Sequence, residues 1–230
     1  MRAANFLMYG GKMKKYNSVL FDLDGTLLNT IGDIAEAVNH AQRSFGYPEH
    51  SVEEVERMVG NGIRKLLERA TPEGEDNPNF EAILSDFVSY YMAHVAVKTD
   101  YYPGIRELVE KLHAHGVKMA IVSNKFQAGC DELLQRFFAD TMTTALGDGE
   151  GRARKPATDA PFQALKELDA KMYETLYVGD SQVDAQTAEN AGLDYVLVDW
   201  GFCPREDLER WNPLAIISKP EELEKFFLDR

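Results

Sequence analysis

From residue 102 onward the sequence alternates between helical and strand patterns, and this alternation constrains the fold more than any other feature. Tyr102-Pro103-Gly104 opens the region, and Gly116 ends its first helical segment. The apolar spacing predicts helices at 105–115, 126–138, 159–168 and 183–191, and strands at 117–122, 141–146, 175–178, 195–198 and 215–217. Such alternation is typical of a parallel sheet with helices on both faces.

The segment before this region has a different pattern. The apolar run 18–21 predicts one more strand, whereas residues from about 30 to 98 carry apolar side chains at helical spacing. We therefore expect an α/β fold, with a Rossmann-like parallel-sheet core and an all-helical cap domain inserted after the first strand. The expected boundaries are a loosely ordered N-terminal extension at 1–15, the core at 16–29 and 99–230, and the helical insertion at 30–98.

The strand at 18–21 ends in two acidic residues, Asp22 and Asp24, followed by Gly25. Side chains alternate along a strand, so both carboxylates point the same way and repel each other. A divalent cation such as Mg²⁺ would relieve this repulsion, and a solvated Asp-Gly turn is an equally weighted alternative. A calcium loop is excluded because Leu27 stands at the position where that loop needs glycine.

Composition narrows the possible partners. The chain has 25 basic and 38 acidic residues, a formal net charge of −13, and 44% apolar residues. Such a charge repels nucleic acid and anionic membranes, so we expect neither as a partner, and a phosphorylated ligand would need a local cation. No stretch approaches the roughly 18 unbroken apolar residues of a membrane span. Cys130 and Cys203 form no metal or redox pattern, and we expect a reducing, cytoplasmic location.

Polar side chains also follow two later strands of the predicted sheet. Ser123, Asn124 and Lys125 follow the strand at 117–122, and Asp180 follows the strand at 175–178. In open α/β sheets, ligands bind beyond the carboxyl ends of the strands. These residues are therefore predicted to meet at one edge with Asp22, although Ser123 standing alone could equally be a helix cap.

Two further residues belong to the same predicted edge. Asp184 lies one helical turn after Asp180, and Lys155 lies in the basic loop 147–156. Each has a structural alternative: Asp184 completes a capping box with Ser181, and a lysine in such a loop is usually solvated. A purely structural role can explain each of these residues alone, but it is a poor explanation for all of them gathering at one edge.

Taken together and in their order along the chain, these motifs resemble those of the haloacid dehalogenase-like hydrolase superfamily. The resemblance is to its phosphatase branch, which has a helical cap after the first strand. The resemblance runs from about Tyr16 to the end. It is carried by Asp22-Leu23-Asp24-Gly25-Thr26, Ser123-Asn124, Lys155-Pro156, and Gly179-Asp180 with Asp184. The run from Met58 to Leu67 and the run Ser123-Asn124-Lys125 resemble phosphoglycolate phosphatases, although Thr158 stands where that group often has proline.

This resemblance implies a phosphatase mechanism. Asp22 would be the nucleophile that forms an aspartyl-phosphate, and Asp24 the general acid and base. Mg²⁺ would be held by Asp22, the backbone carbonyl of Asp24 and Asp180, with Asp184 bound directly or through water. The residues implied to bind the substrate are Ser123, Asn124, Lys155 and Thr26.

The helical insertion would close over the site and select the substrate. Its hinges are expected at 29–31 and 97–102, and Arg64 is a candidate for binding a substrate carboxylate. The Gly60-Asn61-Gly62 run is equally explained as a substrate-facing loop or as a plain helix connection. The favoured substrate is a small phosphate monoester resembling phosphoglycolate, and the expected state is a monomer or weak homodimer.

Several other functions are weighed against this one. Asp24 argues against a dehalogenase, which needs no acid for its leaving group. Thr26 argues against a phosphomutase, because the mutases of this superfamily usually carry another residue after the Asp-Gly pair. A pyrophosphatase, a nucleotidase or a sugar-phosphate phosphatase stays open. The non-enzyme alternatives are a phosphoacceptor signalling receiver, which the large insertion and Asp24 fit poorly, and a binding module that has lost catalysis.

Overall fold

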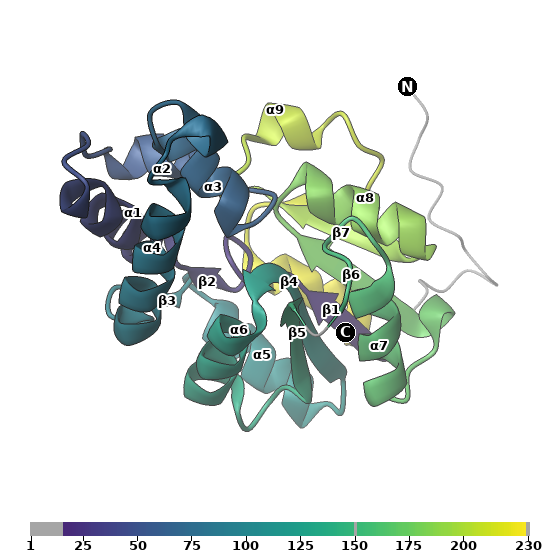
Figure 1. Ribbon diagram of the computed structural model, residues 1–230. Coiled ribbons are helices and arrows are strands. Elements are labelled where there is room, and N and C mark those ends of the chain that lie inside the picture. The colour runs from purple at the N-terminus through teal and green to yellow at the C-terminus, as the bar shows by residue number, and fades with distance from the viewer. Residues whose placement is uncertain (1–15, 150, 229–230) are drawn as a thin grey trace.

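The computed structural model describes residues 16–149 and 151–228, and these build a six-stranded parallel sheet (Figure 1). The strand order is β5-β4-β1-β6-β7-β8. The strands are β1 (Ser18–Phe21), β4 (Lys118–Phe126), β5 (Thr144–Asp148), β6 (Thr175–Gly179), β7 (Asp194–Val198) and β8 (Ile216–Ile217). The predicted parallel-sheet core is confirmed, and the expectation for 1–15 falls outside the described residues.

The central strand β1 is buried on both faces, which explains its unbroken apolar sequence. Val19 and Phe21 pack into the core on one face, and Leu20 packs into the core on the other. Phe21 is level with Ile121 of β4 and with Val178 of β6. The carboxyl ends of these three strands therefore lie side by side.

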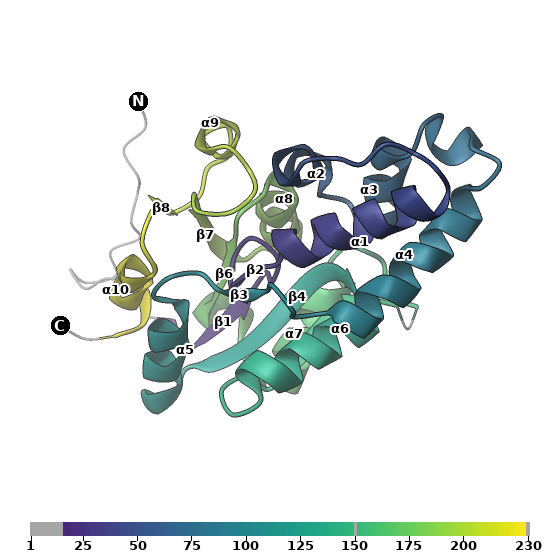
Figure 2. The same cartoon turned by 90° about the vertical axis from the view of Figure 1, so that its left-hand side faces the viewer.

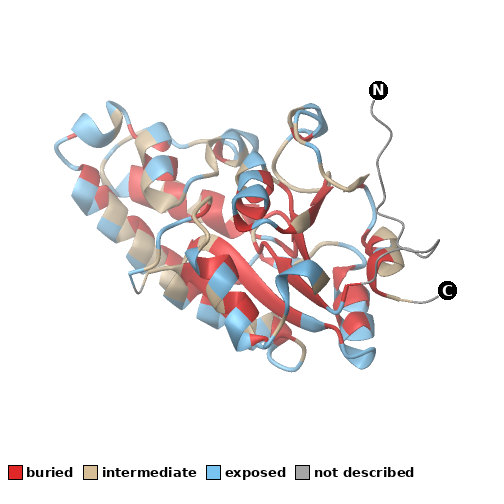
Figure 3. Ribbon diagram, turned by 90° about the vertical axis from the view of Figure 1, so that its right-hand side faces the viewer, coloured by how far each residue is buried: buried red, intermediate tan, exposed pale blue. Residues whose placement is uncertain are grey.

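Helices cover both faces of the sheet, and the buried residues gather on the strands and on the helix sides that face them (Figure 3). The core on one face includes side chains from α5, α6 and α10, and the core on the other includes side chains from α7, α8 and α9. These helices are α5 (Ile105–Ala114), α6 (Gln127–Leu133), α7 (Asp159–Glu167), α8 (Gln182–Ala191), α9 (Arg205–Leu208) and α10 (Glu224–Phe227).

A helical unit is inserted between β1 and the rest of the sheet, as predicted. It consists of α1 (Ile31–Ser44), α2 (Val52–Met58), α3 (Ile63–Ala70) and α4 (Phe80–His94). The long helices α1 and α4 run side by side (Figure 2). The capping box predicted at Ser51 and Glu54 is present at the start of α2.

The two chain segments that enter and leave the helical unit are tied together. The short strands β2 (Leu28–Asn29) and β3 (Asp100–Tyr101) pair antiparallel. Next to them, the buried Asp33 carboxylate accepts hydrogen bonds from the backbone N–H groups of Lys98 (2.8 Å) and Thr99 (2.9 Å) and from the Thr99 hydroxyl (2.6 Å). Because its hydrogen bonds are satisfied in this way, the buried carboxylate holds the entering and the leaving segment at a fixed spacing.

The predicted bounds of strands β4 and β5 are wrong. Strand β4 continues to Phe126, so α6 begins at Gln127. Strand β5 begins at Thr144 because the backbone N–H groups of Thr141 and Met142 both donate to the carbonyl of Phe138 (3.0 Å each) and hold that segment in a turn. The register between β4 and β5 shifts between Val122 and Phe126. Residues 123–125 therefore form an irregular stretch near the carboxyl end of β4.

None of the helices in the described residues is long and apolar enough to cross a membrane.

Candidate active site

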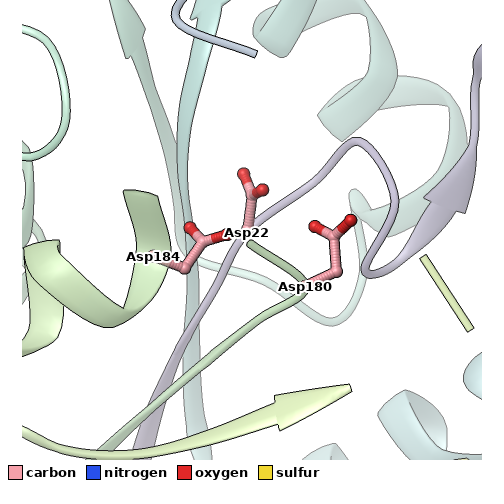
Figure 4. Close-up of side chains that lie close together, drawn as sticks. All are labelled: Asp22, Asp180 and Asp184. Atoms are coloured by element: carbon pink, nitrogen blue, oxygen red, sulfur yellow. The ribbon is translucent and has the colours of Figure 1, made fainter. Parts of the chain in front are cut away.

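Acidic and basic side chains gather where the carboxyl ends of β1, β4 and β6 lie side by side. Asp22 follows β1, Asp180 follows β6, and Asp184 lies in the first turn of α8. Their carboxylates face a common space in Figure 4. A cavity of about 960 Å³ extends from Asp22 and Asp180 to the helical unit, where α2, α3 and α4 contribute to its lining.

The three carboxylates form a buried acidic cluster. One oxygen from each of Asp22, Asp180 and Asp184 lies within 4.8 Å of the others. Burial, followed by the charge of Asp184, raises the pKa of Asp22 well above its usual range. The same two causes raise the pKa of Asp180 to about 7. Three hard oxygen donors that repel one another in this way could hold a divalent cation.

Lys155 brings a positive charge into this cluster. Its ammonium lies 2.8 Å from Asp22 Oδ1 and 2.8 Å from Asp184 Oδ1, and its side chain is buried. Burial alone would lower the pKa of Lys155, but the two carboxylates outweigh it and raise that pKa well above its usual range. The surface alternative for this lysine is therefore wrong.

Asn124 holds the backbone on which Lys155 is carried. Its side-chain Oδ1 accepts a hydrogen bond from the Lys155 backbone N–H (2.8 Å), and its Nδ2 donates to the Lys155 carbonyl (3.1 Å). The side-chain amide of Asn124 is thus directed at the loop.

Asp180 is held by groups on both sides. Its Oδ1 accepts a hydrogen bond from the Thr26 hydroxyl (3.1 Å), and its Oδ2 accepts one from the Phe202 backbone N–H (2.8 Å). Gly25 and Gly201 approach so closely that a methyl group on either would collide with Asp180. The structure therefore places the Thr26 hydroxyl against Asp180, and Gly25, at a φ of +86°, adopts a conformation that favours glycine.

Asp184 is fully buried, and all of its polar capacity is used within the protein. Its Oδ1 accepts from Lys155 Nζ (2.8 Å) and the Tyr177 hydroxyl (3.1 Å). Its Oδ2 accepts from the backbone N–H (3.1 Å) and hydroxyl (2.5 Å) of Ser181, so the predicted capping box is present. Four donors occupy the lone-pair positions of one carboxylate. This arrangement favours a role for Asp184 in orienting Lys155.

Asp24 lines the cavity, but its carboxylate lies outside the acidic cluster. Both of its oxygens accept from the ammonium of Lys125, at 2.9 Å and 3.2 Å. The Lys125 side chain is only 4% exposed. Ser123 is buried beside it and also lines the cavity, and its hydroxyl accepts a hydrogen bond from the Lys125 backbone N–H (3.2 Å).

Sequence reasoning placed Lys125 at this edge and gave it no role. The available signal was its position directly after Ser123 and Asn124, at the end of a buried strand. Lys125 lies where the register of β4 with β5 shifts, and local sequence patterns reveal neither this shift nor the pairing with Asp24.

Arg64 does not line this cavity. Its guanidinium donates to Glu81 (2.5 Å) and lies 3.5 Å from Glu75, so its charge is paired within the helical unit. Arg57 and Arg69 contribute to the lining in its place. Neither was singled out from the sequence.

The Gly60-Asn61-Gly62 run connects α2 with α3 and also lines the cavity. Arg69 supports it by donating to the carbonyls of Met58 (2.6 Å) and Gly60 (3.1 Å). Arg154 of the core also approaches it, with Nη1 at 2.9 Å from the position that a Gly62 Cβ would take. The turn is thus both a helix connection and a wall of the cavity.

Aspartate carboxylates serve as nucleophiles in several classes of enzyme, and here Asp22 lies against a lysine at the carboxyl edge of a parallel sheet, where ligands bind in α/β folds. A family model described as haloacid dehalogenase-like hydrolase matches residues 19–198. The chain therefore belongs to the haloacid dehalogenase-like hydrolases, as the sequence motifs predicted. Within that family it is a phosphatase.

Its relatives agree with this assignment. The chain is 31% identical over 225 residues to a phosphoglycolate phosphatase from Pseudomonas syringae pv. syringae, covering 94% of this chain and 80% of that protein. It is 34% identical over 198 residues to one from Cereibacter sphaeroides, covering 83% and 89%. A crystal structure of a candidate phosphoglycolate phosphatase from Lactobacillus delbrueckii subsp. bulgaricus has a TM-score of 0.88 at 31% identity, covering 94% of this chain and 100% of that chain.

Proposed function

We propose that this phosphatase is Mg²⁺-dependent and hydrolyses a small phosphate monoester through an aspartyl-phosphate at Asp22. The observation that carries the proposal is the contact of 2.8 Å between Asp22 Oδ1 and the buried ammonium of Lys155, inside a cluster of three carboxylates. The ammonium fixes the direction of the Asp22 carboxylate and favours its charged form. A carboxylate nucleophile needs both.

In the first step, an Asp22 oxygen forms a bond to phosphorus while the ester P–O bond breaks. The electron pair of that bond stays on the leaving oxygen, which takes a proton from the carboxyl group of Asp24. Asp24 is suited to this step because it lines the same cavity two residues after Asp22. The alcohol leaves with its proton, and Asp24 is left as a carboxylate.

In the second step, water attacks phosphorus and gives a proton to the Asp24 carboxylate. The bond between phosphorus and the Asp22 oxygen breaks, which restores the Asp22 carboxylate and releases inorganic phosphate. Asp24 ends the cycle protonated, as it began. One residue therefore supplies the acid and then the base, and it does so from one position.

The acidic cluster fits a bound Mg²⁺. Three carboxylates and one ammonium, that of Lys155, are buried together, and repulsion between the carboxylates contributes to the raised pKa of Asp22 and of Asp180. We propose that Asp22, Asp180 and the backbone carbonyl of Asp24 hold the ion, and that Asp184 acts by holding Lys155. Mg²⁺ would lower the repulsion between the nucleophile and the phosphoryl group.

The remaining predicted residues take supporting roles in this proposal. Ser123 and Lys155 would donate to the phosphoryl oxygens, and Asn124 would add its backbone N–H while its side chain holds the Lys155 loop. Thr26 would act by holding Asp180. The helical unit would be a cap, with hinges at 29–31 and 97–102 that cover the cavity and exclude water.

We propose a substrate with a carboxylate beside its phosphate, such as phosphoglycolate. Relatives that carry this name support the proposal. The cavity lining contributed by the helical unit includes Arg57 and Arg69, and Arg69 is engaged with backbone carbonyls. Arg57 is therefore the better-placed arginine for a substrate carboxylate, ahead of Arg64.

The test is a panel of phosphate esters assayed with and without Mg²⁺, with Asp22→Asn alongside the unaltered protein. The panel includes a carboxylated ester, a sugar phosphate, a nucleotide and pyrophosphate. We expect Mg²⁺-dependent turnover, highest on the carboxylated ester, and its loss in the variant. Undiminished turnover by Asp22→Asn would reject the nucleophile, and a preference for pyrophosphate or the nucleotide would replace the proposed substrate.

A further inference from the structure

Lys125 connects the carboxylate of Asp24 with helix α4 of the helical unit. Its ammonium lies 2.9 Å and 3.2 Å from the two Asp24 oxygens. The same ammonium lies 4.8 Å from the centre of the Tyr91 ring, which belongs to α4. A cation at this distance from an aromatic face is attracted to it, and the attraction grows when both are removed from water. Lys125 thus bridges the sheet edge and the helical unit.

The position of this ammonium is fixed by the packing around it. A methyl group on Gly129 of α6 would lie 3.3–3.4 Å from three side-chain carbons of Lys125, so the absence of a side chain there gives the lysine stem its space. The Tyr91 ring closes the other side and is itself buried. Three elements, β4, α6 and α4, therefore determine where the charge sits.

Stability alone does not explain this arrangement. Taking an ammonium and a carboxylate out of water is costly, and a buried ion pair is often no more stabilising than apolar residues of the same volume. A pair that is costly and lies on the lining of the cavity calls for a functional reason.

We propose that Lys125 is a positioning residue for Asp24, and that the seating of α4 on Lys125, through Tyr91, sets the direction of the Asp24 carboxyl group. This inference rests on the proposed function. One Asp24 oxygen stays on the ammonium while the other faces the leaving oxygen of the substrate. Without Lys125, the carboxyl group would be free to rotate, and repulsion from Asp22 would turn it away.

The first test compares Lys125→Met and Lys125→Arg on two substrates. A p-nitrophenyl ester has a leaving group that needs no proton, whereas a small alkyl phosphate needs one. We expect Lys125→Met to lower kcat/KM by about 100-fold on the alkyl ester and by about threefold or less on the p-nitrophenyl ester. Lys125→Arg should recover part of the loss on the alkyl ester, because it restores a donor to Asp24. An equal loss on both esters would overturn the proposal.

The second test reaches Lys125 from the side of the helical unit. The measured quantity is the ratio of kcat/KM on the alkyl ester to kcat/KM on the p-nitrophenyl ester. Tyr91→Phe keeps the ring and should keep the wild-type ratio. Tyr91→Leu removes the ring and should lower that ratio in the same direction as Lys125→Met. This variant leaves Lys125 and Asp24 in place, so it remains informative if Lys125→Met fails to fold. An unchanged ratio in Tyr91→Leu would overturn the part of the proposal that concerns α4.

A matched control and a double variant complete the design. Lys118 lies at the other end of β4, where its ammonium donates to the carbonyl of Asp169 (2.7 Å), and Lys118→Met should leave the ratio unchanged. Adding Lys125→Met to Asp24→Asn should cause little further loss on the alkyl ester, since both act through one group. Additive losses would overturn the proposal. Absence of phosphatase activity in the unaltered protein would instead reject the proposed function.

Discussion

Lys155 reaches Asp22 through a buried contact of 2.8 Å, although the two residues lie on different elements and far apart in the sequence. The same ammonium lies 2.8 Å from Asp184, so a lysine shared between two carboxylates balances part of the acidic cluster. Because the group is buried, its removal has consequences for stability as well as for catalysis.

Lys155→Met should therefore destabilise the protein and abolish turnover. Removing one partner of a buried ion pair leaves an uncompensated charge, which costs about 3 kcal/mol or more in the free energy of unfolding. Urea unfolding of the metal-free protein measures this cost. Added Mg²⁺ should recover part of it, because it supplies positive charge to the same cluster. Lys171→Met is the control, since Lys171 is 64% exposed and should be neutral. Unfolding of Lys155→Met at the wild-type urea concentration would contradict the account.

Metal binding should depend on pH through Asp180. Burial, then the Asp184 charge, raises the pKa of Asp180 from 3.8 to about 7 in the metal-free protein. When the pKa of a carboxyl group is higher in the folded than in the unfolded protein, its proton stabilises the folded state. This stabilisation is fully present at a pH below the pKa of the unfolded state. That contribution is lost as the pH rises through the folded value. The metal-free protein should therefore lose stability toward about pH 8 relative to Asp180→Asn.

Mg²⁺ should consequently stabilise the protein more at about pH 8 than at about pH 6, where it competes with a proton. Thermal unfolding at both pH values, with and without the ion, measures the difference. In Asp180→Asn the shift caused by Mg²⁺ should be small at both values. An equal shift at the two pH values in the unaltered protein would count against Asp180 as a ligand.

Gly25→Ala should disturb the metal site beyond its effect on the backbone. Gly25 has a φ of +86°, and a methyl group there would collide with Asp180. Gly46 has a φ of +75°, and no atom of the described residues lies within 4 Å of the position that its Cβ would take, so Gly46→Ala carries the backbone strain alone. Both variants should lose about 1–2 kcal/mol of stability from this strain. Only Gly25→Ala should raise the Mg²⁺ concentration that activity requires. If both variants required a similar Mg²⁺ concentration, this account of Asp180 would be contradicted.

Arg57→Ala should change the substrate profile, and Arg64→Ala should not. Arg57 lines the cavity, whereas Arg64 is paired with Glu81 and Glu75 outside its lining. Losing a charge-assisted contact with a substrate carboxylate should lower kcat/KM about tenfold on carboxylated esters and leave other esters unaffected. Steady-state assays of both variants on the same panel measure this. A selective loss in Arg64→Ala alone would restore the sequence-based prediction.

The sheet and the acidic edge could be predicted because they depend on local patterns and one general rule. Strands β1, β4 and β6 are apolar runs that end in polar residues, and parallel strands bring those ends to one edge. Asp22, Ser123 and Asp180 are found there for this reason. The capping boxes at Ser51 and Ser181 are local patterns as well, and both are present.

The partners of individual side chains could not be predicted in the same way. Lys125 lies in the stretch of β4 where the register with β5 shifts, and its partner Asp24 is 101 residues away in the sequence. Arg64 is absent from the cavity lining and is paired with Glu75 and Glu81, which come from later segments. Both outcomes depend on contacts between distant segments, which the sequence around either residue does not specify.

The aspartyl-phosphate is the central claim, and trapping it is the most direct test. Protein mixed with ³²P-labelled substrate and Mg²⁺ is quenched in acid within one turnover and digested, and the labelled peptide is sequenced by mass spectrometry. The account predicts label on Asp22, released by hydroxylamine, with none in Asp22→Asn. Turnover without label on Asp22, or label on another residue, would contradict it.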